Sequence, residues 1–479
     1  MKKSKLLVNT TLAGAIVFST FIPTAFAHDA LDFEAGNKAG SAFTQEELNE
    51  MQLGFSSTGG KNVRFLTEAA SLQIEPINGS QKNMADVYAY KGFAYTGTHT
   101  AGGGNGGVRV FDLKDPANPV EVATFANDIP FTWQEKVIVR SVNTPHFKGD
   151  LAVVSVQQTS RNNANRPDSI GGVLLYDVSD PYNPERLGFY ELDRRITGTH
   201  ELYLTTQGNR ALLLTSSPYA DFYTGGVEKD FQIIDVTNPT SPEKLWQFDP
   251  RVLPEVPESF DGYFWFVEEE NRNRPVFNHS VITDNNGHYA YVSMWDLGTV
   301  IFDIRNPEEP VYLGRTSFES HVKGAAHSAA LAKGGTILIE TREVANPVGA
   351  GYEDAYGYTR IYDIKDKTNP VLLSQFTTEL TFDVPESPAG RSTFAKTVHD
   401  PKVLGNTLYL SYYSGGVVHV DITNPSNPVE IGRYTPERSN VWGVFVDRNY
   451  VLASDMNSGL KVLLKNNAGG NKGGNQPTE

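Results

Sequence analysis

The chain has 479 residues and a formal net charge of −15, and 39% of its residues are hydrophobic. The acidic balance argues against a nucleic-acid-binding protein, because phosphate backbones select basic surfaces. The absence of cysteine excludes disulfides, cysteine metal sites and lipid attachment through cysteine.

Residues 1–27 have the features of a secretory signal peptide. Lysines near the start precede an apolar run, Leu12–Ile22, and Ala25–Ala27 forms an A-x-A cleavage site. The alternative is an N-terminal membrane anchor, but the run is short for one. We therefore expect a mature N-terminus at His28 and a secreted or cell-surface protein. No later segment approaches the ~20 apolar residues that a membrane span needs.

The two ends of the mature chain differ from its middle. Residues 28–61 form an N-terminal segment in which Thr44–Glu47 is a capping box that predicts a short helix. Residues 466–479 are rich in Gly and Asn and predict a flexible tail. Residues 62–465 remain as one repetitive unit.

One motif recurs through residues 62–465. Its copies read GGVRVFDLKDPANPVEV from Gly106, GGVLLYDVSDPYNPERL from Gly171, DFQIIDVTNPTSPEKL from Asp230, GTVIFDIRNPEEPVYL from Gly298, YTRIYDIKDKTNPVLL from Tyr358 and GGVVHVDITNPSNPVEI from Gly415, with a worn copy, SGLKVLLKN, from Ser458. The V-x-V-F-D stretch alternates like a strand, and the D-x-x-P step predicts a tight turn before the next strand. Another strand pair precedes each copy. Four short strands at a period of roughly 40 to 60 residues are typical of propeller blades.

The repeats predict an all-β fold, a seven-bladed β-propeller closed by an N-terminal strand. The first strands of the blades are expected near Asp86, Ser141, His200, His279, His327, His399 and Trp442. The last unit lacks a fourth strand. Asn62–Leu66 resembles that strand, so we expect it to complete the last blade and remove the open edge.

The GGVxVFDVxDPxNPxxV units resemble the LVIVD-repeat propeller proteins, exported proteins of bacteria and archaea. The resemblance covers most of the chain from Asp86 to Leu464. It implies the propeller fold and a secreted or surface location, and it implies no particular activity, since fold does not fix function.

The repeated aspartates could be mistaken for a carboxylate cluster. They are Asp112, Asp177, Asp235, Asp303, Asp363 and Asp421. A catalytic group has no reason to recur in every blade, whereas a turn-forming residue has. We therefore interpret them as turn residues.

Long insertions are predicted on one face of the propeller. They fall between the second and third strands of a blade or between blades: 157–170, 216–229, 249–277, 341–357 and 377–398. Both kinds of connection emerge on the same face, and long loops on a rigid scaffold often carry function. These loops are rich in aromatic and acidic residues, which suit protein or glycan contact. Packing of the loops onto the blades is the alternative explanation.

Four histidines open the inner strands of successive units: His200, His279, His327 and His399. Asp86 holds the same place in the first unit and Trp442 in the last, while His146 of the second unit falls in a turn on the opposite face. Imidazoles at one height of the channel could bind a transition metal. They could equally hydrogen-bond neighbouring blades.

Two functions therefore remain open. The first is binding of an extracellular protein or glycan by a monomer, with Asp86, Tyr219, Tyr223, Trp265, Tyr352, Tyr356 and Trp442 as candidate contacts. The second is a metal-dependent, possibly redox, enzyme whose ligands are the four histidines.

Overall fold

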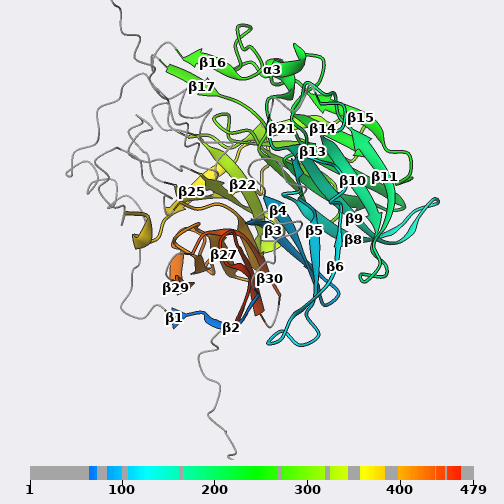
Figure 1. Ribbon diagram of the computed structural model, residues 1–479. Coiled ribbons are helices and arrows are strands. Elements are labelled where there is room, and N and C mark those ends of the chain that lie inside the picture. The colour runs from blue at the N-terminus through cyan, green and yellow to red at the C-terminus, as the bar shows by residue number, and fades with distance from the viewer. Residues whose placement is uncertain are drawn as a thin grey trace, which may run out of the picture.

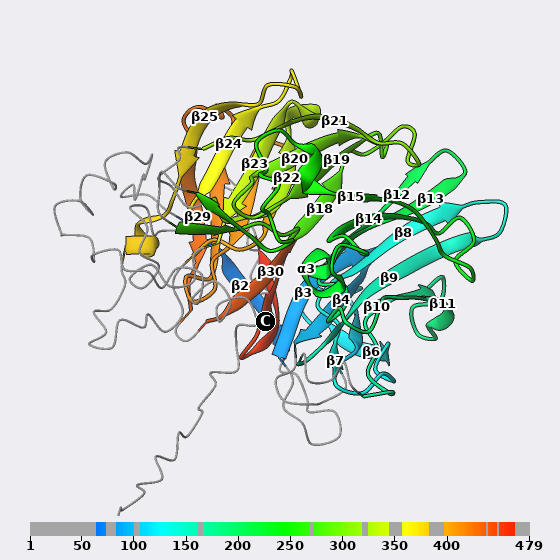
Figure 2. The ribbon, with the colours of Figure 1, turned by 90° about the horizontal axis from the view of Figure 1, so that it is seen from above.

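The computed structural model describes residues 64–72, 83–99, 106–160, 166–267, 272–318, 324–343, 357–382, 397–436, 439–447 and 450–464. These residues form a seven-bladed β-propeller, as the repeats predict, with the blades arranged around a central axis (Figures 1 and 2). None of the helices in the described ranges has the length and apolar character to cross a bilayer.

The first three blades are antiparallel sheets whose strands follow chain order from the axis outward. Blade one contains β3 (Asn83–Tyr90), β4 (Phe93–His99), β5 (Val108–Asp112) and β6 (Val120–Phe125). Blade two contains β8 (Val137–Asn143), β9 (Lys148–Gln158), β10 (Gly172–Asp177) and β11 (Glu185–Glu191), and β7 (Thr132–Trp133) pairs with the end of β9. Blade three contains β12 (Glu201–Gln207), β13 (Arg210–Ser216), β14 (Phe231–Asp235) and β15 (Glu243–Phe248).

The next three blades repeat this order. Blade four contains β18 (Ser280–Thr283), β19 (Tyr289–Ser293), β20 (Thr299–Asp303) and β21 (Val311–Arg315). Blade five contains β22 (Ala326–Ala332), β23 (Ile337–Arg342), β24 (Thr359–Asp363) and β25 (Val371–Phe376). Blade six contains β26 (Pro401–Leu404), β27 (Thr407–Ser411), β28 (Val417–Asp421) and β29 (Val429–Tyr434).

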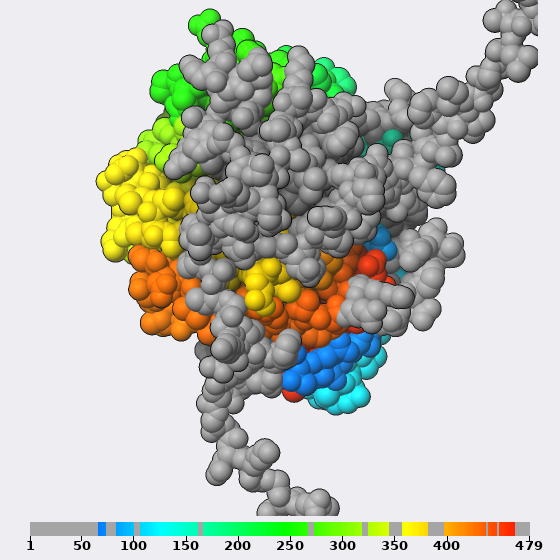
Figure 3. Space-filling view, turned by 90° about the vertical axis from the view of Figure 1, so that its left-hand side faces the viewer, coloured from blue at the N-terminus to red at the C-terminus, as the bar shows by residue number. Residues whose placement is uncertain are grey.

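The seventh blade joins the two ends of the chain. It contains β30 (Val441–Val446), β31 (Tyr450–Asp455) and β32 (Gly459–Leu464), and its outer strand is β2 (Thr67–Leu72), antiparallel to β32. Figure 3 shows the blue N-terminal segment packed against orange and red C-terminal segments. The propeller is therefore closed by an N-terminal strand, as predicted.

The prediction of which residues close the propeller was wrong. Arg64–Phe65, within the predicted Asn62–Leu66, forms β1 and pairs parallel with β29 at the outer edge of blade six. The strand that completes blade seven is the following segment, β2. Alternating side chains identify an extended segment, but they do not determine which of two neighbouring edges it joins. The segments at 28–61 and 466–479 lie outside the described residues.

The core lies between neighbouring blades. Leu214 and Ile233 of blade three, for example, belong to one buried cluster with Val292 and Val300 of blade four. Burial of each such side chain stabilises the fold by about 1.5–3 kcal/mol. Because each sheet buries both faces against its neighbours, the blades hold their inner strands in fixed positions around the axis.

The six motif aspartates form turns, as interpreted from the sequence. In each turn a side-chain oxygen accepts a hydrogen bond from the backbone N–H two residues later, and the donors are Lys114, Ser179, Thr237, Arg305, Lys365 and Thr423. The donor–acceptor distance is 2.7 Å for Asp112 and 3.0 Å for Asp303. This is the Asx-turn geometry that favours aspartate at such positions.

Two insertions carry structure of their own. The connection from β13 to β14 contains α3 (Ala220–Thr224). The connection from blade three to blade four contains the short helix η2 (Pro250–Val252) and the hairpin of β16 (Phe264–Val267) and β17 (Arg272–Pro275). Figure 1 shows α3 and this hairpin at the same end of the molecule. Two further short helices, η4 (Lys333–Gly335) and η5 (Glu379–Phe382), lie in blade five and after it.

Candidate metal centre

The starts of the inner strands place the predicted histidines on the axis. His200, His279 and His399 each precede an inner strand, and each backbone N–H donates to the carbonyl of a serine that ends the second strand. The three distances are 2.9, 2.8 and 2.9 Å, with acceptors Ser216, Ser293 and Ser411. This repeated bond fixes the histidines at the same height in three blades. His327 is the second residue of β22.

The four histidines belong to a closed circle of seven rings, which we call the axial ring. Its members, in order around the axis, are His200, His279, His327, His399, Trp442, His99 and Trp133. Neighbouring ring centroids are separated by 3.9 Å at the closest, between His279 and His327, and by 6.0 Å at the widest, between Trp133 and His200. Every member is buried, and the most exposed, His99, is 6% exposed. The axial ring therefore encloses a site with little access to bulk water.

Two imidazoles have the same orientation. The Nδ1 of His279 lies 3.1 Å from the carbonyl oxygen of His327, and the Nδ1 of His327 lies 3.1 Å from the carbonyl oxygen of His399. A carbonyl can only accept, and the hydroxyl of Ser328, 2.9 Å from the Nδ1 of His327, can accept as well, so each Nδ1 carries the proton. In the neutral tautomer each Nε2 is then left with a lone pair. Both imidazoles therefore present an unprotonated Nε2, whose lone pair is available to a metal ion.

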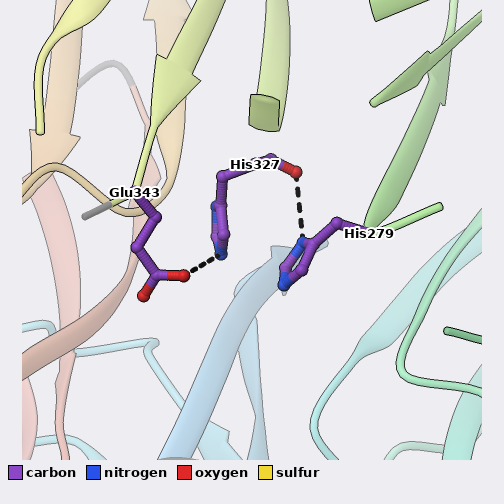
Figure 4. A group of neighbouring side chains, drawn as sticks. All are labelled: His279, His327 and Glu343. Carbon is purple, nitrogen blue, oxygen red and sulfur yellow. Dashed lines mark hydrogen bonds and ion pairs between the residues drawn. The ribbon is translucent and has the colours of Figure 1, made fainter. Parts of the chain in front are cut away.

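Glu343, which follows β23, faces these two imidazoles (Figure 4). One of its carboxylate oxygens lies 3.5 Å from the Nε2 of His327, and the other accepts a hydrogen bond of 2.5 Å from the hydroxyl of Tyr413. His279, His327 and Glu343 can each offer one ligand atom, and these three atoms all lie within 4.8 Å of one another. Two imidazoles and one carboxylate form a ligand set that transition metals use.

His200 adds a third imidazole to this group. Its Nε2 lies 3.1 Å from the Nε2 of His279, while its Nδ1 lies 2.5 Å from a carboxylate oxygen of Glu135 and 3.0 Å from the side-chain oxygen of Gln157. Burial, together with the nearby charge of Lys136, lowers the pKa of His200 to about 3. His200 is therefore neutral at ordinary pH, which is the state in which imidazole binds a metal.

His399 contributes differently from the other three histidines. Its ring centroid lies 4.3 Å from that of His327, so it belongs to the axial ring. It is not part of the three-residue group that could share an ion, where Glu343 supplies the third ligand atom. Its carbonyl oxygen accepts from His327, and so orients that imidazole.

Buried charges lie beside the axial ring in what we call the ionic cluster, formed by Asp86, Lys136 and Glu201. The ammonium of Lys136 lies 2.7 Å from Asp86 and 3.0 Å from Glu201. Burial lowers the pKa of Lys136, but the surrounding carboxylates more than offset this and raise it well above its usual range. Burial likewise raises the pKa of Glu135 well above its usual range, against the charge of Lys136. Buried charges need such pairing, because desolvation is costly.

The ionic cluster also corrects one expectation. The second inner strand begins at Val137 and not near Ser141, so Glu135 and Lys136 occupy the axial end of blade two. His146 lies in the turn between β8 and β9, as expected. Placing that strand correctly in the sequence would have revealed both charged residues.

Two buried aromatic residues next to the axial ring have strained backbones. Trp295 (φ 38°) and Tyr413 (φ 44°) follow the second strands of blades four and six and make equivalent bridges to the next blade, with Ala326 and Val441. Trp295 lies 5.5 Å from His279 between ring centroids, and Tyr413 lies 5.0 Å from His399. Positive φ in a bulky residue is unusual and clusters at functional sites. Neither residue was predicted from the sequence.

The other predicted contact residues are dispersed. Asp86 belongs to the ionic cluster, and the Nε1–H of Trp442 donates to Glu135 over 3.2 Å. Tyr219 is buried at the start of α3, while Tyr223 and Trp265 are half-buried. Tyr352 and Tyr356 lie outside the described residues.

The family model that matches this chain is the LVIVD repeat, at residues 221–248, 286–317 and 396–436. These stretches fall in blades three, four and six. Solved structures of similar fold include the computationally designed Ika8 protein, with 11% identity, a TM-score of 0.46, and coverage of 83% of this chain and 100% of that one. Another is Raptor from Chaetomium thermophilum, with 13% identity, a TM-score of 0.49, and coverage of 89% of this chain and 31% of that one. No curated protein matches.

Proposed function

From a seven-bladed propeller that carries LVIVD repeats, we infer a metal-dependent enzyme whose centre lies on the propeller axis. The proposed ligands are the Nε2 atoms of His200, His279 and His327 and the carboxylate of Glu343. A transition metal bound there would supply Lewis-acid or one-electron chemistry. Because the axial ring is buried, the proposed substrate is a small molecule.

The orientation of the imidazoles carries this proposal. His279 and His327 both donate their Nδ1–H to backbone carbonyls, and a carboxyl oxygen of Glu135 lies at the Nδ1 of His200. Metal-binding histidines almost always have such partners on their second nitrogen, which fix the tautomer and aim the first nitrogen. Histidines that served only to join the blades would not need their Nε2 atoms to converge on a carboxylate.

The donor set of three imidazoles and one carboxylate suits a first-row transition metal. Imidazole nitrogen binds Zn, Cu, Fe and Ni, and the subset of His279, His327 and Glu343 matches the two histidines and one carboxylate of non-haem Fe(II) sites. The test is elemental analysis of protein purified without a histidine tag, before and after incubation with Fe²⁺, Cu²⁺ or Zn²⁺. We expect a stoichiometric transition metal. Background levels under every condition would contradict the proposal.

Glu135 should tune the proposed centre without being a ligand. Glu135→Gln replaces the carboxyl group, one oxygen of which lies 2.5 Å from the Nδ1 of His200, by an amide of nearly the same volume. We expect metal affinity to fall by about 10–100-fold, the usual effect of losing an outer partner of a ligand. Competition with a chromogenic chelator measures this. Glu340→Gln is the control, because Glu340 is equally buried but pairs with Arg360 at 3.1 Å in blade five. An equal loss of affinity in both variants would show a general effect of buried charge.

The inserted face supports a second candidate function, binding of an extracellular protein or glycan. Large apolar side chains are exposed on the insertions between β13 and β18: Phe222 at 40%, Val227 at 59%, Val252 at 71% and Phe266 at 52%. Exposed apolar groups gathered on one set of loops favour a contact surface. If the protein took up no metal, binding of an extracellular partner would be the only one of the two candidate functions left.

A further inference from the structure

We propose that a line of aromatic side chains carries single electrons between the axial centre and the surface at α3. The line consists of Tyr223, Tyr219, Phe277 and Trp295, and it ends at His279. This inference rests on the proposed function. A one-electron carrier that docks at α3 would exchange a single electron with the buried metal through this line, so that the carrier and the metal change oxidation state by one in opposite directions.

The rings of this line are in sequential contact. Between ring centroids, Tyr223 lies 6.3 Å from Tyr219, Tyr219 lies 4.7 Å from Phe277, and Phe277 lies 4.8 Å from Trp295 in a stacked arrangement. Trp295 is then 5.5 Å from His279 and 6.3 Å from His327, the two imidazoles drawn in Figure 4. Electron transfer through protein weakens steeply with distance, so an unbroken series of short steps is what a route requires.

The line begins at the surface and ends inside. Phe222, whose ring centroid lies 5.0 Å from that of Tyr223, is 40% exposed, and Tyr223 is half-buried. Trp295, at the inner end, is 1% exposed. In the view of Figure 2, α3 lies near the middle of the ring of blades, above the axis. The line thus spans the depth that separates solvent from the axial ring.

Trp295 has the chemistry that an electron relay needs. Indole and phenol are the side chains that lose one electron most readily. Within the described part of the chain, the indole N–H of Trp295 has no hydrogen-bond acceptor. An oxidised Trp295 would therefore keep its proton, and the step is the movement of one electron alone. A buried donor without an acceptor is rare and calls for an explanation.

Backbone strain at two positions also argues for a role beyond packing. Tyr219 has φ 67° and Trp295 has φ 38°, both in the left-handed region that bulky residues avoid. Such conformations cost on the order of 1–3 kcal/mol each and persist where the surroundings demand them. Both strained residues lie in this one line. Selection for packing alone would favour residues that fit without strain.

The absence of cysteine makes a direct test possible. A ruthenium photo-oxidant can be attached to a single introduced cysteine, at Val227→Cys beside α3 or at Val120→Cys on the outer strand of blade one. The two sites are matched in exposure, at 59% and 58%. After a flash, an added quencher takes one electron from the excited complex. The oxidised ruthenium then takes one electron from the protein, and Trp295 is left as a radical.

In metal-free protein we expect a tryptophan radical signal by electron paramagnetic resonance from the label at position 227, and little from position 120. Both labelled proteins carry Trp265→Phe, because Trp265 is a half-buried indole on the same set of insertions, between β13 and β18, as the first label. Trp295→Phe should abolish the signal, whereas Trp246→Phe, in the outer strand of blade three, should leave it unchanged. Equal yields from the two labels, or a yield that Trp295→Phe does not change, would overturn the relay.

Protein loaded with Cu⁺ separates the relay from the metal site. There the electron lost by Trp295 is replaced from Cu⁺, which becomes Cu²⁺ and gains its own resonance signal. Retention of the radical pattern in a protein that takes up no metal would refute the metal centre and leave the relay standing. Metal uptake with no difference between the labels would refute the relay alone.

Discussion

Replacing His279 or His327 by asparagine is expected to abolish stoichiometric metal binding while the propeller stays folded. Asparagine can place an amide N–H near the position of Nδ1, so it can keep the bond to the carbonyl of the next blade, at 3.1 Å in both wild-type positions. It has no atom at the position of Nε2. The variants therefore remove the proposed ligand and retain the contact between blades.

The loss of affinity should exceed the ~10–100-fold expected for an outer partner such as Glu135. Elemental analysis and chelator competition measure it, and thermal unfolding monitors the fold. His288→Asn is the matched control, because His288 is exposed in the turn between β18 and β19, at the opposite end of the inner strand of blade four from His279. If His279→Asn lowered the thermal midpoint without changing metal content, the histidines would be structural.

A chain that starts at residue 73 is expected to lose much of its stability compared with one that starts at residue 64. The shorter chain lacks β2, which pairs with β32 over five residue pairs, and the contacts of Glu68 with Tyr434 and of Ser71 with Lys461. It also exposes Leu460 and Val462, which are fully buried in the closed ring. The free edge of β32 would promote association between chains.

Thermal unfolding and light scattering measure the two effects. A synthetic peptide of residues 61–74 offers a rescue, because an added strand can complete an open sheet in trans. The peptide should raise the midpoint of the shorter chain and leave that of the longer chain unchanged. Equal midpoints for the two chains without peptide would show that β2 contributes little.

The fold was predictable because the strands and turns of each repeat follow from the local sequence of that repeat. The alternating V-x-V-F-D stretch and the Asx turn at Asp112 or Asp177 depend on neighbouring residues alone, so local rules suffice. The pairing of β2 with β32 joins residues far apart in the sequence. Resemblance to a fourth strand predicted a closing strand at Asn62–Leu66, but the strand that completes blade seven is the next segment, because the edge that each segment joins depends on the geometry of the closed propeller.

The candidate site was only half predictable for a similar reason. The histidines recur at one position in the repeat, so a common offset located His200, His279 and His327. Glu135 holds the matching place in blade two, but the inner strand of that blade was expected near Ser141, so the offset did not reveal it. Glu343 occupies no repeated position, and a residue of that kind meets the imidazoles only because different blades converge on the axis. A single sequence holds no periodic signal for such residues. Their detection required the packed structure.

The shared seventh blade also has a consequence for the order of events during synthesis. Ser71 of β2 and Lys461 of β32, which are hydrogen-bonded in the finished blade, are separated by 390 residues. At a translation rate of about 5–20 residues per second, the early strand waits roughly 20–80 s for its partner. During that time the first six blades can form in sequence, but no ring exists. The propeller can therefore close only after β32 has been synthesised, and a chain that stops before Gly459 remains open.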